Sequence, residues 1–297
     1  MTTTITTIAS LRDTLKPHRG TQRIALVPTM GNLHDGHLSL VKLAKQHADI
    51  VVVSIFVNPT QFGVGEDLDS YPRTLDADTQ KLASVGVDYI FAPSVDDMYP
   101  VLPPPTQVLA GEISSQLCGQ TRPTHFDGVG LVVSKLFNIV QPNVAVFGQK
   151  DYQQLAIIRQ LVRDLSYDIE IIAAPIVRAD DGLALSSRNQ YLSADERKIA
   201  PVLHQYVSQL ADKLTQAEHI NEASATDLSI LQSLIDDSIT QINDAGFKVD
   251  YLEVRRQDLQ NISNTKQDTA LVIVTAAWLG KARLLDNQQV IVKIPMS

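Results

Sequence analysis

Short apolar runs rich in β-branched residues alternate with longer amphipathic segments along the first 175 residues. The apolar runs predict five strands, at Ile24–Val27, Ile50–Val57, Val87–Ala92, Val144–Phe147 and Ile169–Ile176. The segments between them predict four helices, at Leu38–Gln46, Leu75–Ser84, Gly128–Ile139 and Tyr152–Leu165. Continuous apolar strands separated by helices are typical of a parallel sheet that is buried on both faces. We therefore expect an α/β domain over residues 1–175, with helices on both faces of its sheet.

The pattern changes near Pro175, where we place a domain boundary. Two amphipathic helices are predicted at Ala200–Lys213 and Leu228–Asn243, joined by a polar, exposed stretch around Thr215–Thr226. Two or three strands follow, at Val249–Val254, Leu271–Ala277 and Val290–Ile294. Because strands no longer alternate with helices, residues 176–297 are expected to form a smaller α+β domain.

Composition narrows the classes of protein that fit. The chain has 297 residues and a net charge of −8, from 25 basic and 33 acidic residues. An acidic surface repels nucleic acid, so no nucleic-acid partner is expected. The start of the chain lacks a secretory signal, no apolar run reaches the ~20 residues that cross a bilayer, and Cys118 is the only cysteine. We expect a cytoplasmic protein without a membrane partner.

The segment Met30–His37 follows the first predicted strand and leads into the first predicted helix. Unpaired backbone N–H groups and the positive end of the helix dipole at such a turn suit a phosphate. Gly31 and Gly36 let the backbone approach a ligand, and His34 and His37 can donate hydrogen bonds to phosphoryl oxygens. The two histidines could instead be capping or packing residues, or part of a metal site. Zinc is disfavoured because the chain has one cysteine and no His-Glu-x-x-His segment.

Other polar segments fit the same chemistry. Lys150 stands where the fourth predicted strand leads into a helix, and Arg188 follows two serines in the segment Asp181–Asn189. Together with the histidine pair, they predict a cage for a triphosphate. A surface ion pair of Lys150 with Asp151, and a plain loop around Ser186 and Ser187, are the alternatives. The glycine-rich and acidic stretch Phe62–Asp69 is expected to be a mobile loop.

The order of these motifs resembles a known family. Pro28–His37 is similar to the His-x-Gly-His signature of the nucleotidyltransferase superfamily that includes class I aminoacyl-tRNA synthetases, and Leu185–Arg188 is similar to its second, KMSKS-like loop. More specifically, the chain resembles the pantothenate synthetase (pantoate–β-alanine ligase) family. The further matching segments are Phe56–Phe62, Tyr71–Thr74, Arg122–Phe126, Gly148–Gln154 and Gly182–Asn189.

This resemblance implies a Rossmann-like N-terminal domain, a smaller C-terminal domain that closes over the ATP site, and a homodimer. It implies a ligase that uses ATP to convert pantoate to pantoyl adenylate, which then reacts with β-alanine to give pantothenate and AMP. Another adenylyltransferase of the superfamily and a catalytically inactive nucleotide-binding protein remain alternatives. A tRNA-charging enzyme is disfavoured by the length and acidity of the chain.

The resemblance also implies roles for individual residues. The catalytic residues would be His34, His37, Lys150 and Arg188, with His37 as the proton donor. The ATP-binding residues would be Met30, Gly31, His34, Gly36, His37, Gly148, Gln149, Lys150, Asp151, Val177, Leu185, Ser186, Ser187 and Arg188. Gln61 and Gln154 would bind pantoate, and Gln61 would also lie near β-alanine. For these two glutamines the alternative is a surface amide, and for Val177 it is a core residue.

Two residues depart from the family pattern. The sequence does not identify a protein ligand for a metal ion. Gln149 stands where the family commonly has Glu, and Leu185 stands where it commonly has Met. The exchange of Met for Leu keeps a similar volume. Mg²⁺ is expected to accompany ATP. Asp78 is the candidate ligand, although we prefer to interpret it as part of a solvated helix face.

Overall fold

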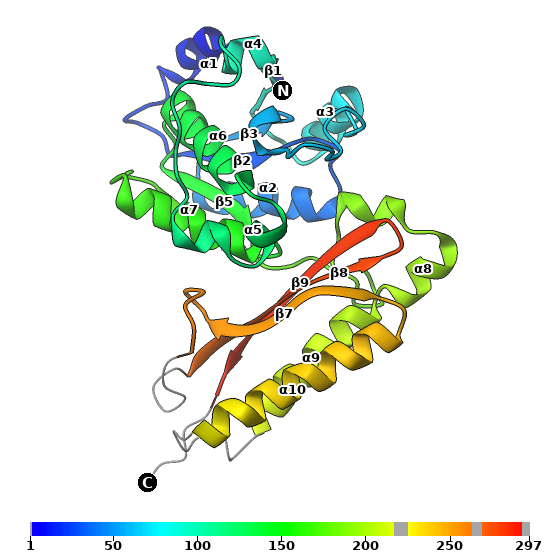
Figure 1. Cartoon of the computed structure of the whole chain (residues 1–297). Helices are drawn as coiled ribbons and strands as arrows, with labels where there is room; N and C mark the ends of the chain where they lie inside the picture. Colours follow the sequence, from blue (N-terminus) through cyan, green and yellow to red (C-terminus); the bar gives the residue numbers. More distant parts are fainter. Residues whose placement is uncertain (1, 217–224, 263–268, 293–297) are drawn as a thin grey trace. The chain divides into compact units, whose positions relative to one another are not determined.

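The computed structural model describes residues 2–216, 225–262 and 269–292. The chain forms two compact units, which we call the N-terminal unit (residues 1–149 and 153–175) and the C-terminal unit (residues 150–152 and 176–297) (Figure 1). Most of the polar stretch expected around Thr215–Thr226, and the end of the strand expected at Val290–Ile294, lie outside the described residues.

A six-stranded sheet in which all strands are parallel forms the centre of the N-terminal unit. Its order is β1-β4-β3-β2-β5-β6. The strands are β1 (Thr3–Ile5), β2 (Ile24–Thr29), β3 (Ile50–Ile55), β4 (Tyr89–Phe91), β5 (Val144–Gly148) and β6 (Glu170–Ala174). The predicted parallel sheet and its five strands are confirmed. The edge strand β1 was not predicted, because a strand of three residues with two threonines has no apolar pattern to detect.

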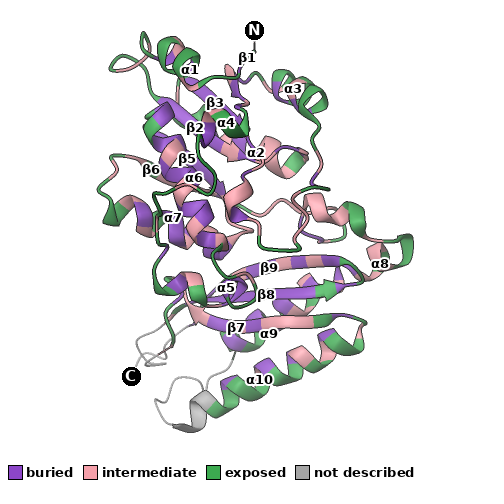
Figure 2. Cartoon of the chain, turned by 45° about the horizontal axis from the view of Figure 1, so that its top comes forward, coloured by how far each residue is buried: buried purple, intermediate pink, exposed green. Residues whose placement is uncertain are grey.

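Helices cover both faces of this sheet, as predicted. Alternate residues of β2 point to opposite faces: Ile24 and Leu26 belong to one core cluster, and Ala25 and Val27 to another. The first cluster includes residues of α1 (Ile8–Leu15), α6 (His125–Val140) and α7 (Tyr152–Asp164). The second includes residues of α2 (Asp35–His47) and α3 (Leu75–Ser84). In Figure 2 the central strands β2, β3 and β5 are largely buried, and the outer sides of α1 and α3 are exposed. Short elements complete the unit: α4 (Val95–Met98), α5 (Cys118–Thr121), and the 3-10 helices η1 (Pro59–Gln61) and η2 (Glu112–Ser115).

The C-terminal unit contains a three-stranded antiparallel sheet in the order β7-β8-β9. The strands are β7 (Lys248–Arg256), β8 (Ala270–Leu279) and β9 (Ala282–Ile291), and the helices are η3 (Ser187–Tyr191), α8 (Ala194–Ile199), α9 (Val202–Gln216) and α10 (Ala225–Asp244). Helices α9 and α10 lie side by side on one face of the sheet, where their apolar residues share a core with it (Figure 1). This confirms the predicted α+β character.

The start of β9 differs from the prediction. The strand begins at Ala282, well before the predicted start at Val290. The polar residues from Asp286 to Gln289 interrupt its apolar pattern, so periodicity alone detected only its end.

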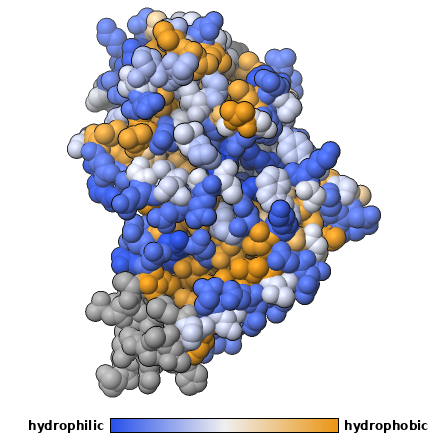
Figure 3. All heavy atoms as spheres, in the orientation of Figure 1, coloured by the Kyte–Doolittle hydropathy of each residue, from blue (hydrophilic) through white to orange (hydrophobic). Residues whose placement is uncertain are grey.

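The described surface mixes hydrophilic and hydrophobic residues. On the face that Figure 3 presents, hydrophilic residues predominate and hydrophobic ones gather in separate groups. Among the described residues, no helix has the length and apolar character needed to cross a bilayer.

Candidate active site

Three site segments lie at one edge of the parallel sheet. They follow the carboxyl ends of β2, β3 and β5, which are neighbours in the sheet. After β2, the chain adds β3 and β4 on one side of β2 and then adds β5 and β6 on its other side. The direction in which strands are added therefore reverses between β2 and β5. Ligands of open α/β sheets bind outside the carboxyl ends of the strands at such a point.

The two histidines cap helix α2 reciprocally. The Nδ1 atom of His34, the N-cap residue, accepts a hydrogen bond from Gly36 N at 3.1 Å. The Nδ1 atom of His37 accepts one from His34 N at 3.3 Å, and the two ring centroids lie 4.2 Å apart. The alternative that these histidines are capping residues is therefore confirmed. Because Nδ1 of each ring is an acceptor, the neutral ring carries its hydrogen on Nε2, where it can be donated to a ligand.

The turn before α2 is held by α3. Asp78 is completely buried, and its carboxylate accepts hydrogen bonds from Asn32 N at 2.9 Å, Leu33 N at 2.8 Å and Thr74 Oγ1 at 2.9 Å. One turn further along α3, Lys81 Nζ donates to Leu33 O at 2.6 Å. The interpretation of Asp78 as part of a solvated helix face is wrong. Its two oxygens already accept three hydrogen bonds, which suits a residue that positions the turn better than a metal ligand.

Gly31 is needed for this close approach. Its φ is +84°, and a Cβ atom there would lie 3.1 Å from both Asp78 Oδ2 and Ile55 Cγ2. A side chain would therefore strain the backbone and crowd the carboxylate that holds the turn.

Gln61 lies in η1 and is buried, with 9% of its surface exposed, so the alternative of a surface amide is wrong for this residue. Its Oε1 accepts a hydrogen bond from Asn58 Nδ2 at 3.0 Å, and its Nε2 donates to Met30 Sδ at 3.2 Å. The structure thus brings together Met30 and Gln61, which come from different segments. Gln154, on α7, is only half-buried.

Asn58 is a site residue that we did not predict. It is 1% exposed, its Nδ2 also donates to Gly128 O at 3.2 Å, and its Oδ1 accepts from Tyr99 Oη at 2.9 Å. Asn58 thereby ties Gln61 to α6 and to the end of α4. The only signal in the sequence was its place in the segment that resembles the family.

The loop of residues 62–69 is attached to the segment around Gln61. It contains no helix or strand, and Arg122 Nε and Nη2 donate to the two carboxylate oxygens of Glu66 at 2.7 Å each. Arg122 Nη1 lies 3.1 Å from His125 Nε2, and His125 Nδ1 lies 2.7 Å from Gln61 O. The hydrogen bonds from Arg122 and its positive charge lower the pKa of Glu66, against a smaller opposing effect of burial. The mobility expected for this loop stays a prediction.

The remaining site residues belong to the C-terminal unit. Lys150 Nζ lies 3.5 Å from Asp151 Oδ1, with 20% of the lysine side chain exposed. Leu185 N donates to Val177 O at 2.9 Å, which pairs the two strands of a hairpin of residues 177–185. Val177 is only partly buried, so it is not a core residue. Ser186 caps η3, and its Oγ accepts a hydrogen bond from Arg188 N at 3.2 Å.

The candidate residues therefore form two sets. The set in the N-terminal unit is Met30, Gly31, His34, Gly36, His37, Gln61, Gly148, Gln149 and Gln154. The set in the C-terminal unit is Lys150, Asp151, Val177, Leu185, Ser186, Ser187 and Arg188.

The chain is similar to known proteins over almost its whole length. The sequence model of the pantoate–β-alanine ligase family matches residues 3–289. The chain belongs to this family. The ligase is 70% identical to a pantothenate synthetase of Psychrobacter sp. (strain PRwf-1), over 98% of this chain and 99% of the relative. It is 54% identical to one of Acinetobacter baumannii (strain AYE), over 97% and 98% of the two chains.

Solved structures resemble the ligase over almost its whole length. A pantothenate synthetase of Thermus thermophilus matches with a TM-score of 0.85 and 41% identity, over 97% of this chain and 99% of that one. A pantoate–β-alanine ligase of Francisella tularensis, complexed with beta-gamma ATP and beta-alanine, matches with a TM-score of 0.77 and 36% identity, over 97% of each chain.

Gln149 and Leu185, the two residues that depart from the family pattern, both donate backbone hydrogen bonds. Gln149 N donates to Ala174 O at 2.8 Å, and Leu185 N donates to Val177 O. These backbone contacts do not depend on the identity of either side chain.

Proposed function

We propose the following roles for the residues of this ligase, which joins pantoate to β-alanine at the expense of ATP. In the first step, a carboxylate oxygen of pantoate attacks the α-phosphate of ATP, and pyrophosphate leaves. In the second, the amine of β-alanine attacks the acyl carbon of pantoyl adenylate, which yields pantothenate, AMP and a proton. The observation that supports this proposal is the reciprocal capping of His34 and His37, which fixes both rings through Nδ1.

The histidines would stabilise the charge that develops on phosphate. Their Nε2–H groups are preorganised because backbone N–H groups hold both rings through Nδ1. Donors that are fixed before the reaction cost no reorganisation in the transition state. We propose that both histidines bind phosphate oxygens through Nε2–H. The proton-donor role of His37 that the resemblance implies would require its imidazolium form, in which Nδ1 no longer accepts the hydrogen bond from His34 N. Lys150 and Arg188 would supply the positive charges that balance the triphosphate.

The other ATP-binding roles are also proposals. Backbone groups of Met30, Gly31 and Gly36 would approach the nucleotide. The further ATP-binding residues would be Gly148, Gln149, Asp151, Val177, Leu185, Ser186 and Ser187.

Gln61 is suited to bind pantoate. Its Nε2 donates to the sulfur of Met30, and a thioether is a weak acceptor. Replacement of that contact by a carboxylate or hydroxyl oxygen of pantoate would strengthen the hydrogen bond. We propose that Gln154 supplies a second amide to pantoate and that Gln61 also lies near β-alanine.

Mg²⁺ is proposed to enter with ATP, held mainly by the phosphates. In the described part of the chain, no group of three or more His, Cys, Asp or Glu side chains could hold a metal ion. Mg²⁺ commonly keeps several waters and binds through substrate phosphates with few protein ligands. We further propose that the ligase is a cytoplasmic homodimer.

Exchange of labelled pyrophosphate into ATP tests the first step. The assay contains pantoate and Mg²⁺ but no β-alanine, and we expect exchange that requires pantoate. β-Alanine is then added, and mass spectrometry should detect pantothenate and AMP in equal amounts. Pyrophosphate release without pantothenate would favour a different adenylyltransferase. Nucleotide binding without exchange or product would favour an inactive nucleotide-binding protein.

A further inference from the structure

Two neighbouring polar residues interrupt the apolar pattern of β9. Asp286 and Asn287 are 4% and 3% exposed. Side chains of consecutive strand residues point to opposite faces of a sheet, so this pair can hold one segment on each face. Neither residue was singled out by its sequence.

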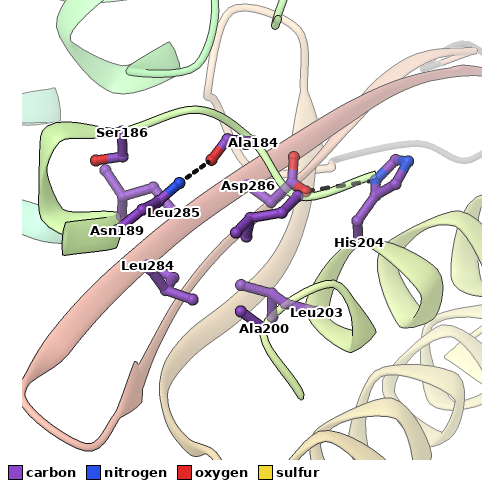
Figure 4. Close-up of a pocket in the computed structure, with 10 residues that line it drawn as sticks. Ala184, Ser186, Asn189, Ala200, Leu203, His204, Leu284, Leu285 and Asp286 are labelled. Atoms are coloured by element: carbon purple, nitrogen blue, oxygen red, sulfur yellow. Dashed lines mark hydrogen bonds and ion pairs between the residues drawn. The ribbon is translucent and has the colours of Figure 1, made fainter. Parts of the chain in front are cut away.

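The first segment is held by Asp286. Its carboxylate accepts two hydrogen bonds from Arg178, Nη1 to Oδ2 and Nη2 to Oδ1, each at 2.7 Å. His204 Nδ1 of α9 lies 3.4 Å from Oδ2, as the close-up in Figure 4 shows. Burial alone would raise the pKa of Asp286, but the interactions of its carboxylate with His204 and Arg178 outweigh this effect, and the pKa lies below its ordinary value. The carboxylate is therefore charged and paired at neutral pH.

Arg178 connects Asp286 to the loop that carries Ser186 and Arg188. It lies in the hairpin of residues 177–185, forms a β-bridge with Ala184, and donates through Nη1 to Gly182 O at 3.1 Å. Asn189 Nδ2 in turn donates to Ala184 O at 3.0 Å, which closes the loop that carries Ser186 and Arg188 (Figure 4). A series of contacts thus links the carboxylate of Asp286 to this loop.

The second segment is held by Asn287. Its Nδ2 donates to Lys150 O at 2.9 Å. Tyr152 Oη donates to Gln257 O at 2.9 Å and lies 3.3 Å from Gln289 Nε2. These contacts attach residues 150–152 to the same sheet.

We propose that Asp286 and Asn287 are positioning residues that set the two cationic segments, around Lys150 and around Arg188, at the spacing that MgATP requires. The proposal rests on the proposed function of these two segments. Two cations on one rigid sheet keep a fixed separation, and a misplacement of about 1 Å can cost about 100-fold in rate.

A purely structural role for Asp286 is the alternative, and the same sheet offers a matched control. Asp250 Oδ2 accepts hydrogen bonds from Arg283 Nε at 3.0 Å and Nη2 at 2.6 Å, and both side chains are at most 15% exposed. Asp250→Asn therefore breaks a carboxylate–guanidinium pair between β7 and β9, and neither residue of this pair belongs to the segment around Lys150 or to the segment around Arg188.

The experiment compares Asp286→Asn, Asn287→Ala and Asp250→Asn in the full-length protein. We expect the first two to raise the KM for ATP about 10-fold or more, with the KM for pantoate within about twofold of wild type. Asp250→Asn should lower the Tm and leave both KM values unchanged. Equal increases in both KM values, or an unchanged KM for ATP in folded Asp286→Asn, would overturn the proposal.

A second variant covers the case in which Asp286→Asn does not fold. Arg178→Lys keeps the charge but loses the bidentate geometry, so it should also raise the KM for ATP selectively. A KM for ATP equal to wild type in this variant would count against the proposal. Calorimetric measurement of MgATP binding to each variant distinguishes a failure of this proposal from a failure of the proposed function. Weakened binding of MgATP can be detected even if the wild type shows no pyrophosphate exchange.

Discussion

At the scale of residues, each histidine of the turn combines two functions through the two nitrogens of its ring. Nδ1 accepts a backbone hydrogen bond, which fixes the ring and its tautomer, and Nε2–H is the group that we propose as a donor to phosphate. A substitution at His37 therefore disturbs both the helix cap and the proposed phosphate contact unless the two are separated.

The substitution His37→Asn separates the helix cap from the proposed phosphate contact. The amide oxygen of Asn can take the place of Nδ1 in the cap, but the side chain is too short to replace Nε2–H. We expect an approximately 100-fold or greater loss of pyrophosphate exchange with the Tm close to wild type, because loss of one preorganised donor costs about 100- to 1,000-fold. Unchanged exchange in this variant would remove His37 from the mechanism.

The ion pair of Glu66 with Arg122 predicts a dependence of stability on pH. The pKa of Glu66 lies below its ordinary value of 4.5, so the pair contributes stability above about pH 4.5 and loses it as the pH falls through the lower pKa of the folded state. At pH 7 we expect Glu66→Gln to lower the free energy of unfolding by about 1 kcal/mol or less, because the pair is partly exposed.

This difference between wild type and Glu66→Gln should shrink as the pH is lowered below 4.5 in denaturant titrations. A difference that grows on acidification would contradict the assigned pKa direction.

At the scale of elements, α3 supports the turn before α2 although the two are far apart in sequence. Asp78→Ala would remove the acceptor of the partly buried Asn32 N–H group and of the buried Leu33 N–H group. Each buried donor without a partner costs about 1–3 kcal/mol, so we expect a loss of roughly 2–4 kcal/mol in the free energy of unfolding and reduced exchange.

Denaturant unfolding measures this loss, and Asp76→Ala provides the control. Asp76 is exposed on the same helix, so its replacement should have little effect. Equal stabilities of the two variants would contradict the role assigned to Asp78.

Helix α6 packs directly against the backbone of η1. A Cβ atom at Gly128 would overlap Thr60 O and lie 2.7 Å from Gln61 N, both of which are backbone atoms. Gly128→Ala should therefore displace η1, raise the KM for pantoate about 10-fold and destabilise the fold by about 1–3 kcal/mol. In Gly130→Ala the new Cβ would lie 3.3 Å from Val108 Cγ1, a side-chain atom that can move, so its kinetics should match wild type. An unchanged KM for pantoate in Gly128→Ala would show that η1 tolerates the displacement.

At the scale of the whole molecule, the proposed homodimer predicts a mass in solution. Light scattering coupled to size-exclusion chromatography should give twice the chain mass of 32.6 kDa, because the proposed state contains two chains. Dilution over two orders of magnitude tests the stability of this state. A mass of 32.6 kDa under all conditions would exclude the dimer.

The sequence alone determined the α/β class, the positions of the five main strands along the chain and the position of the histidine turn. These features depend on local information: the period of apolar residues sets the type of element, and the His-x-Gly-His segment carries its own cap. The resemblance of ordered motifs then indicated the family. A strand without apolar period, such as β1 or the start of β9, was not detectable in this way.

Only the tertiary structure decided which distant residues support the site. Asp78, Asn58 and the pair Asp286–Asn287 are polar residues whose local sequence is typical of a helix face, a loop and an interrupted strand. Their partners lie dozens of positions away or more, and long-range packing brings them together. A buried polar group is stable only with such partners, so its role depends on contacts that no local pattern encodes.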